Sequence, residues 1–191
     1  MYKAESDPYC YSDRDVLKNK AGLTSADALE AFETAMTFAR SEEPMPHGRF
    51  SARHYRRIHH HLFQDVYGWA GKYRTVRLTK GASTFCYPEN IAPEMQRLFS
   101  DLREQQFLKS LTPRLFTETA AHFLAELNAI HPFREGNGRS QFTYIAMLAG
   151  HAGHPMDLDR LEPDRWLAAM IKSFGGDEQP LVRVLAGLID P

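Results

Sequence analysis

The segment His131–Phe142, with the sequence HPFREGNGRSQF, separates two stretches in which apolar residues recur at helical spacing. Pro132 disfavours a helical conformation at His131, so we expect the preceding helix to end there. A new helix is expected over about residues 137–149, and Gly150 is expected to end it. The segment is therefore predicted to join the C-terminus of one helix to the N-terminus of the next.

The predicted loop carries groups that suit an anion. The N–H groups of Gly136, Asn137 and Gly138 can point into one concavity, and the first turn of the new helix adds partial positive charge. Arg139 follows in that turn and can donate two parallel hydrogen bonds to a phosphate. Glu135 would repel the phosphate unless it binds Mg²⁺, which takes one or two protein carboxylates together with substrate phosphates. The loop is predicted to bind a nucleotide with magnesium.

Two further residues of the segment have predicted roles. A histidine titrates near neutral pH, so His131 suits a general base. No serine or cysteine of the chain is placed as an obvious nucleophile, and the hydroxyl that reacts is expected from another molecule. The predicted chemistry is in-line attack of that hydroxyl on a nucleotide phosphorus. Phe133 is expected to anchor the loop in the core.

The rest of the chain is predicted to be mainly helical. Between the second and third expected helices, residues 74–88 alternate apolar and polar side chains around Lys80-Gly81-Ala82, which predicts a short β-hairpin. We expect one helical domain with a single hairpin. The other expected helices lie at about residues 24–40, 51–68, 93–102, 112–130, 163–174 and 178–189. Ser51 and Thr112 are expected to cap the helices that they precede, and Pro113 follows Thr112.

Composition excludes several function classes. The chain has 23 basic and 24 acidic side chains and a formal net charge of -1, so we expect no direct nucleic-acid partner and no membrane surface as partner. No run approaches the roughly 18 apolar residues of a membrane span, and a cytoplasmic protein is expected. The run His59–His61 is not expected to be a metal site, because neighbours on a helix point about 100° apart. These histidines are expected to be solvated or to lie at the edge of the core.

The sequence HPFREGNGR of His131–Arg139 resembles the signature of the Fic (filamentation induced by cAMP) family. Three other stretches are similar to regions of bacterial Fic proteins: DVLKNKAGL, IHHHLFQDVYGWAGKYR and TKGASTFCYPE. The resemblance covers roughly residues 9–175. It implies a single Fic domain over residues 1–191, with an N-terminal helical part (about 1–70), a flap (about 74–88), a motif-bearing core (about 89–175) and a C-terminal helix (about 178–189).

The resemblance implies a protein adenylyltransferase, which transfers AMP from ATP to a Ser, Thr or Tyr hydroxyl of a target protein. By the same resemblance His131 is the base and Glu135 is the magnesium ligand. The loop from Gly136 through Asn137 to Gly138 holds the α-phosphate, and Arg139 holds the β-phosphate.

The hairpin corresponds to the flap of the family, which aligns a target segment by strand pairing. Lys80, Gly81 and Phe85 lie where such a flap contacts its target. The resemblance implies type II topoisomerase subunits or small GTPases as target classes. It favours a toxin-type enzyme in the cytoplasm, with a secreted effector as the alternative.

Phe142 departs from the family motif, which usually has a second arginine at this position. In the family that arginine contacts the γ-phosphate and pairs with the glutamate of an inhibitory helix. Phe142 is expected to pack in the core instead. We therefore expect either weaker binding of ATP or a different nucleotide.

Three alternatives to adenylyl transfer remain. A relative that transfers another phosphate-containing group, phosphocholine, shares the motif. A Fic-like kinase is disfavoured because its branch departs from the Glu-Gly-Asn-Gly core that this chain keeps. The third alternative is a binding module that keeps the fold and the flap but has little or no catalytic activity.

The inhibitory pattern of the family, Ser or Thr, three residues, Glu, then Gly or Asn, has no full match. Residues 100–104 fit its first five positions, but Gln105 follows. A small antitoxin-like partner is expected to supply the inhibitor, unless the loss of the second arginine makes such restraint unnecessary.

Overall fold

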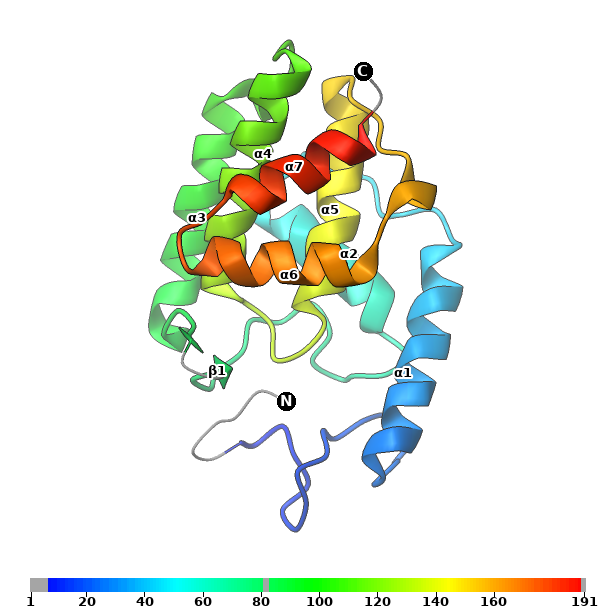
Figure 1. The fold of residues 1–191 in the computed structure, drawn as a ribbon. Helices are drawn as coiled ribbons and strands as arrows, with labels where there is room; N and C mark the ends of the chain where they lie inside the picture. Colours follow the sequence, from blue (N-terminus) through cyan, green and yellow to red (C-terminus); the bar gives the residue numbers. More distant parts are fainter. Residues whose placement is uncertain (1–6, 81–82, 190–191) are drawn as a thin grey trace. The chain divides into compact units, whose positions relative to one another are not determined.

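The computed structural model describes residues 7–80 and 83–189. This part of the chain is mainly α-helical, as predicted, with one two-stranded antiparallel sheet (Figure 1). Two short 3₁₀ helices, at Gln106–Leu108 and Leu158–Arg160, were not predicted. The remaining elements are α1 (Ala26–Ser41), α2 (Ala52–Phe63), β1 (Thr79–Lys80), β2 (Ser83–Thr84), α3 (Pro88–Glu104), α4 (Pro113–Ile130), α5 (Asn137–Ala152), α6 (Pro163–Phe174) and α7 (Gln179–Leu188).

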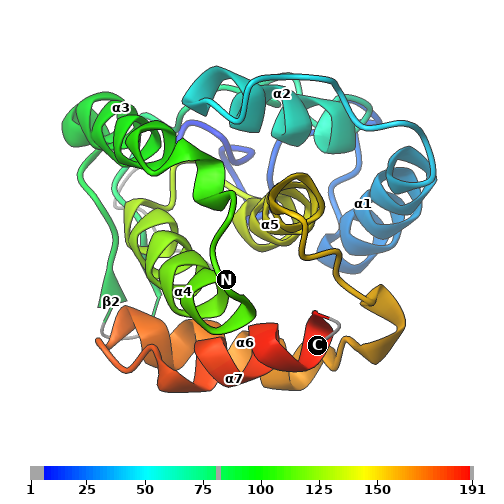
Figure 2. The ribbon, with the colours of Figure 1, turned by 90° about the horizontal axis from the view of Figure 1, so that it is seen from above.

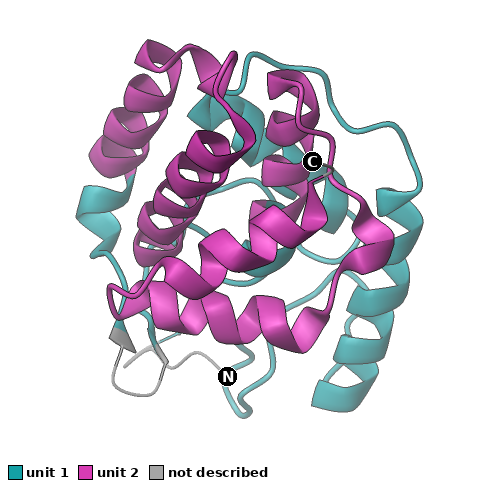
Figure 3. Cartoon of the chain, turned by 45° about the horizontal axis from the view of Figure 1, so that its top comes forward, with its two compact units in different colours: residues 1–91, 132–140 teal, residues 92–131, 141–191 magenta. Residues whose placement is uncertain are grey.

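Contacts between Cα atoms group the chain into two compact units (Figure 3). Unit 1 comprises residues 1–91 and 132–140, and unit 2 comprises residues 92–131 and 141–191. The predicted anion-binding loop therefore packs within unit 1, which also contains α1 and α2. In the described residues, no helix is both long and apolar enough to cross a membrane.

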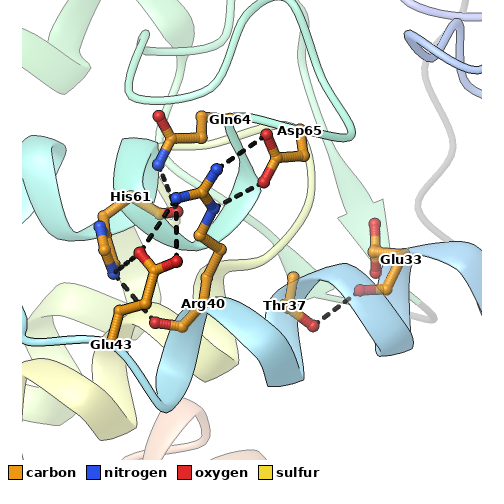
Figure 4. Close-up of polar contacts among 7 residues, drawn as sticks. All are labelled: Glu33, Thr37, Arg40, Glu43, His61, Gln64 and Asp65. Carbon is orange, nitrogen blue, oxygen red and sulfur yellow. Dashed lines mark hydrogen bonds and ion pairs between the residues drawn. The ribbon is translucent and has the colours of Figure 1, made fainter.

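Helices α1 and α2 of unit 1 pack against each other, and an ion pair ties their C-terminal ends together. Arg40 of α1 donates from Nε and Nη2 to the carboxylate of Asp65, at 2.6 and 3.0 Å. His61 of α2 lies 2.9 Å from the Arg40 carbonyl. Figure 4 shows this cluster and, along the same helix, Thr37 and Glu33. The cluster fixes the position of α1 within unit 1.

Helix α2 begins after its predicted cap, Ser51, whose hydroxyl accepts the backbone N–H of His54. The prediction that it continues to Gly68 is wrong, because α2 ends at Phe63. The N–H groups of Val66 and Tyr67 both donate to the Phe63 carbonyl, at 3.0 and 2.9 Å, which closes the helix in a turn.

The predicted hairpin is present, but its strands are only two residues long each. Thr79 pairs with Thr84, and Gly81 and Ala82 of the predicted turn lie outside the described residues. In the segment before β1, the buried side chain of Arg74 donates hydrogen bonds to the carbonyls of Val76 and Cys86, both at 2.6 Å. One guanidinium thus joins the two arms where further strand pairing was predicted.

Helices α4, α6 and α7 of unit 2 pack together, and Figure 2 shows α6 and α7 running alongside each other. Thr112 caps α4 through the N–H of Leu115, as predicted. The side chain of Asn128 on α4 donates to the Met170 carbonyl of α6, at 3.1 Å. Phe99 joins this core through edge contacts with Phe123.

Two other predicted helix boundaries are wrong. Helix α3 begins at Pro88, and the predicted first residue, Pro93, lies inside the helix. Both prolines suit the first position of a helix, so this local signal does not distinguish them. Helix α5 continues through Gly150 to Ala152. It ends at Gly153, whose φ of +92° suits the left-handed conformation that follows many helices.

Candidate active site

His131 ends α4 as predicted and immediately precedes the loop of residues 132–140. It adopts a left-handed conformation with φ 48°, and its N–H donates to the Leu127 carbonyl at 3.0 Å. Its side chain is buried, with the residue 4% exposed. The C-terminal cap of α4 therefore fixes the backbone of the predicted base.

Gly136 makes the turn into α5. Its φ is +81°, and a Cβ at this position would lie 2.3 Å from the ring of Phe63. Its carbonyl accepts the N–H of Ser140 at 3.1 Å, which starts the helix. Gly138 differs, because nothing lies within 4 Å of the place where its Cβ would be. Only the first glycine is required by the folded chain itself.

The side chain of Asn137 closes the loop onto Phe133. Its Oδ1 accepts the Phe133 N–H at 3.0 Å, and its Nδ2 donates to the Phe133 carbonyl at 2.8 Å. The ring of Phe133 is fully buried. These two hydrogen bonds occupy the side-chain amide of Asn137. The group of Asn137 that can bind an anion is therefore its backbone N–H, in the first turn of α5.

His59 on α2 connects the loop to α2 through a hydrogen bond. Its Nδ1 accepts the N–H of Gly71 at 2.8 Å, so Nε2 carries the proton and donates to the Glu135 carbonyl at 3.0 Å. The ring stacks on Phe133 at 3.7 Å between centroids. Burial lowers the pKa of His59 to about 3, so the ring is neutral. Sequence reasoning placed His59 at the surface or core edge, but it is fully buried.

The histidine run His59–His61 contacts three different backbone carbonyls instead of a common centre. The ring of His60 lies 3.1 Å from the Ala70 carbonyl, whereas His61 faces Arg40. Within residues 7–80 and 83–189, no cluster of three or more His, Cys, Asp or Glu side chains could hold a metal ion.

Glu135 is a buried carboxylate with a raised pKa. Burial is the main cause, and the negative charge of Glu33 adds to it. One oxygen accepts the N–H of Gly136 at 2.9 Å, so this predicted phosphate donor faces a carboxylate. The neighbouring Arg134 is paired with Asp7 at 2.6 Å. The positive charges of Arg139 and Arg134 act in the opposite direction and lower the pKa of Glu135, and a bound cation would likewise favour its charged form.

Arg139 extends from the first turn of α5 and is held by side chains that were not predicted. It forms an ion pair with Glu33 of α1, and its Nη1 donates to the hydroxyl of Thr37 at 3.1 Å. Its guanidinium carbon lies 4.7 Å from the ring centre of Phe63. No local sequence signal links α1 to the loop, because Glu33 and Arg139 are 106 residues apart.

A cavity of about 440 Å³ lies within unit 1 and is large enough for a small ligand. Glu135 and Arg139, two of the predicted site residues, both line it. Glu33 and Tyr67 contribute to the same wall. The N-terminal segment supplies further lining residues, including Cys10 and others between residues 15 and 17.

Glu135 suits a divalent cation better than Glu33 does. Both oxygens of Glu33 are engaged, one by Arg139 and the other by the hydroxyl of Tyr67. Glu135 is a cavity carboxylate, and among residues 7–80 and 83–189 its side chain accepts a hydrogen bond only from the backbone N–H of Gly136. Magnesium needs just one or two protein carboxylates when phosphates supply the other ligands, so these residues fit the ion.

The remaining predicted residues lie elsewhere. Phe85 follows β2 and is 7% exposed, so its ring belongs to the core. The backbone of Lys80 belongs to β1. Phe142 packs its ring edge-on against Trp166 of α6, with centroids 5.1 Å apart. The side chain of Phe142 thus has an apolar partner in place of a phosphate.

Comparisons with known proteins agree with the resemblance in the motif. The sequence model of the Fic/DOC family matches residues 49–149. The probable protein adenylyltransferase y4lH of Sinorhizobium fredii is 46% identical over 189 residues, which cover 98% of each chain. The protein adenylyltransferase VbhT of Bartonella schoenbuchensis is 37% identical over 92% of this chain, which spans 37% of that longer protein.

Solved structures agree in fold. The BepC protein of Bartonella tribocorum with bound AMPPNP is 27% identical, covers 96% of both chains and superposes with a TM-score of 0.85. An N-terminal Fic domain from Bartonella quintana with bound ADP is 27% identical, with a TM-score of 0.86 and coverage of 96% of this chain and 94% of that one.

Proposed function

The chain belongs to the Fic/DOC family, and on that premise we propose that it is a protein adenylyltransferase that uses ATP. The observation that carries the proposal is the shared cavity of Glu135 and Arg139, directly at the N-terminus of α5. A helix N-terminus and an arginine together suit phosphate groups. A relative that aligns over 98% of both chains is named a probable protein adenylyltransferase.

The phosphate groups are assigned to the start of α5. In the proposal, the backbone N–H groups of Asn137 and Gly138 bind the α-phosphate, because first-turn N–H groups have no partner within the helix. Arg139 binds the β-phosphate with its remaining N–H donors. Glu135 would hold Mg²⁺, which supplies positive charge against the phosphate oxygens when bound.

His131 acts as the general base. The hydroxyl oxygen of a target Ser, Thr or Tyr attacks the α-phosphorus, and the hydroxyl proton passes to His131. The bond between the α-phosphorus and the bridging oxygen breaks, and pyrophosphate leaves with the bonding electrons. The products are pyrophosphate and a target protein with AMP on its side-chain oxygen. The positive charge of N–H groups and Arg139 stabilises the phosphoryl oxygens during the attack.

The hairpin is the proposed docking element for the target. Because Phe85 is buried, we assign docking to the backbone edge of β1 and β2, which can pair with an extended segment. Type II topoisomerase subunits and small GTPases are the proposed target classes. A toxin-type role in the cytoplasm, with a small antitoxin-like inhibitor as partner, completes the proposal.

The test measures pyrophosphate released from ATP and Mg²⁺ in a bacterial lysate depleted of nucleotides. We expect the purified chain to release pyrophosphate in amounts that grow with the lysate protein added. The His131→Ala variant should still bind ATP and release none. A wild-type chain that binds ATP in the lysate without producing pyrophosphate would instead indicate a binding module.

A further inference from the structure

Arg139 is restrained on three sides without being covered. Glu33 accepts a hydrogen bond from Nη2, Thr37 accepts one from Nη1, and the ring of Phe63 lies against the guanidinium. A guanidinium has five N–H donors, so these contacts leave donors for a ligand. The side chain of Arg139 is 41% exposed and lines the cavity. This arrangement fixes the direction of the arginine and keeps it available.

Glu33 is itself held in one orientation. The hydroxyl of Tyr67 donates to its second carboxylate oxygen, and burial with the Glu33 charge keeps the pKa of Tyr67 well above its usual range. Tyr67 therefore remains a donor. Its ring stacks on Trp69 with centroids 4.3 Å apart. Glu33 is 9% exposed, so neither of its partners is easily replaced by water.

Thr37 presents a fixed acceptor next to Glu33. Its hydroxyl donates to the backbone carbonyl of Glu33 at 2.7 Å, and its lone pairs then face Arg139. The cluster of Arg40 and Asp65 fixes the helix that carries both residues (Figure 4). The two acceptors for Arg139 thus come from the same helix, α1.

We propose that Glu33 is a positioning residue that holds Arg139 in the orientation required for the β-phosphate of the nucleotide. The inference rests on the proposed function, in which Arg139 binds that phosphate. A free arginine side chain has many rotamers, and binding must restrict them, so an arginine restrained in advance binds more tightly. The charge of Glu33 opposes phosphate binding, but Arg139 neutralises it locally.

The experiment measures the affinity of purified variants for ADP and AMP by calorimetry in buffer containing Mg²⁺. Because AMP lacks a β-phosphate, its affinity measures the contacts of the loop without the proposed contact of Arg139. We expect Glu33→Ala to weaken ADP binding about tenfold, the loss of one charge-assisted contact, and to leave AMP binding within about twofold. In an Arg139→Ala background, Glu33→Ala should no longer weaken ADP binding and should strengthen it slightly, because the Glu33 charge is then not neutralised.

Glu30 provides a matched comparison of charge. It lies on α1 and lines the same cavity, but no hydrogen bond among the described residues joins it to Arg139. If Glu33 acted through charge alone, Glu30→Ala and Glu33→Ala would both strengthen ADP binding. The proposal predicts that the two variants change ADP affinity in opposite directions: Glu33→Ala weakens ADP binding and Glu30→Ala strengthens it. Glu33→Gln, which keeps an acceptor, should recover part of the lost affinity.

A milder variant, Tyr67→Phe, tests the proposal if Glu33→Ala does not fold. Tyr67→Phe removes one hydrogen bond to Glu33 and keeps the stacked ring. It should weaken ADP binding about threefold and leave AMP binding unchanged, with a small change in the urea midpoint. The same selective loss in a stable protein would support positioning.

The possible failures are distinguishable. If Arg139→Ala weakens ADP binding whereas Glu33→Ala leaves it unchanged or strengthens it, the positioning role is wrong and the proposed function stands. If Arg139→Ala leaves ADP affinity unchanged, the phosphate assignment in the proposed function is wrong, and the role of Glu33 fails with it. Equal losses for ADP and AMP would show a general structural role.

Discussion

The ring of His59 donates from Nε2 to the backbone carbonyl of Glu135, which lies 76 residues later in the sequence, at 3.0 Å. The other ring nitrogen accepts the N–H of Gly71. One buried, neutral side chain thus connects α2, the segment after it and the proposed nucleotide loop. Its removal should affect the loop directly.

Replacement of His59 is expected to destabilise the protein. His59→Ala would remove a fully buried ring and both of its hydrogen bonds, with an expected loss of about 3 kcal/mol in the free energy of unfolding. The neighbouring His60 is exposed, so His60→Ala serves as the control. Urea denaturation should give a much lower midpoint for the first variant, and similar midpoints for the two would contradict the role of His59.

The neutral state of His59 predicts a dependence of stability on pH. Its pKa is about 3 in the folded chain, below the ordinary value of 6.5, so the unfolded chain binds more protons between these values. The His59 contribution to stability is therefore complete above pH 6.5 and is lost as the pH falls towards 3. Each pH unit in this window removes about 1.4 kcal/mol at most.

The comparison with His59→Gln isolates this contribution, because Gln does not titrate. Glu135 acts in the opposite direction, since its raised pKa favours the folded chain when it is protonated, but it is present in both proteins. The stability difference between wild type and His59→Gln should shrink from pH 6.5 to pH 4.5. A difference that stays constant over this range would contradict a neutral, buried His59.

The two glycines of the loop should respond differently to alanine. At Gly136 an added methyl group would meet the ring of Phe63 and would require a strained φ, so Gly136→Ala is expected to cost about 2 kcal/mol or more. Gly138→Ala should leave stability within about 0.5 kcal/mol. Thermal unfolding of both variants tests this, and equal shifts would be inconsistent with the loop geometry.

Gly138→Ala also reports on the ligand. Its Cβ would enter open space, so any loss of nucleotide affinity in a fully stable variant must come from contact with the nucleotide. We expect weaker binding of both AMP and ADP by calorimetry. Unchanged affinity for both would remove Gly138 from the proposed α-phosphate site.

With Phe142 in place of the family's second arginine, we expect the chain to bind ATP and ADP with similar affinities. Because its ring packs on Trp166, it offers the γ-phosphate no ligand, and the wild-type chain should bind the two nucleotides within about threefold. Phe142→Arg should favour ATP over ADP and lose some stability with the aromatic contact. A wild-type preference for ATP above about tenfold, unchanged in the variant, would refute this explanation.

Local signals predicted much of the fold. A cap followed by proline marked the start of α4, and Pro132 marked its end. Boundaries failed where packing and turns decide them, as at the end of α2, where two N–H groups share the Phe63 carbonyl. The arms of the hairpin also depend on one buried guanidinium, Arg74, which strand periodicity does not reveal.

The proposed site was predictable only where its residues are consecutive. Residues 131–139 contain the loop and its arginine, and their types and order indicated phosphate chemistry. Other contacts of the loop come from residues at least 76 positions away in the sequence: Glu33, Thr37 and His59. Their hydrogen bonds depend on the packing of α1 and α2. A single sequence carries no local pattern for such contacts.

The most direct test of the proposed activity follows the label of ATP. The purified chain and its His131→Ala variant are incubated with Mg²⁺ and lysate proteins, in parallel with ATP labelled on the α- or the γ-phosphate. The account predicts protein labelling from the α-phosphate alone, lost in the variant. Labelling from the γ-phosphate alone would contradict it, because the target hydroxyl would then attack a different phosphorus from the one assigned to the loop.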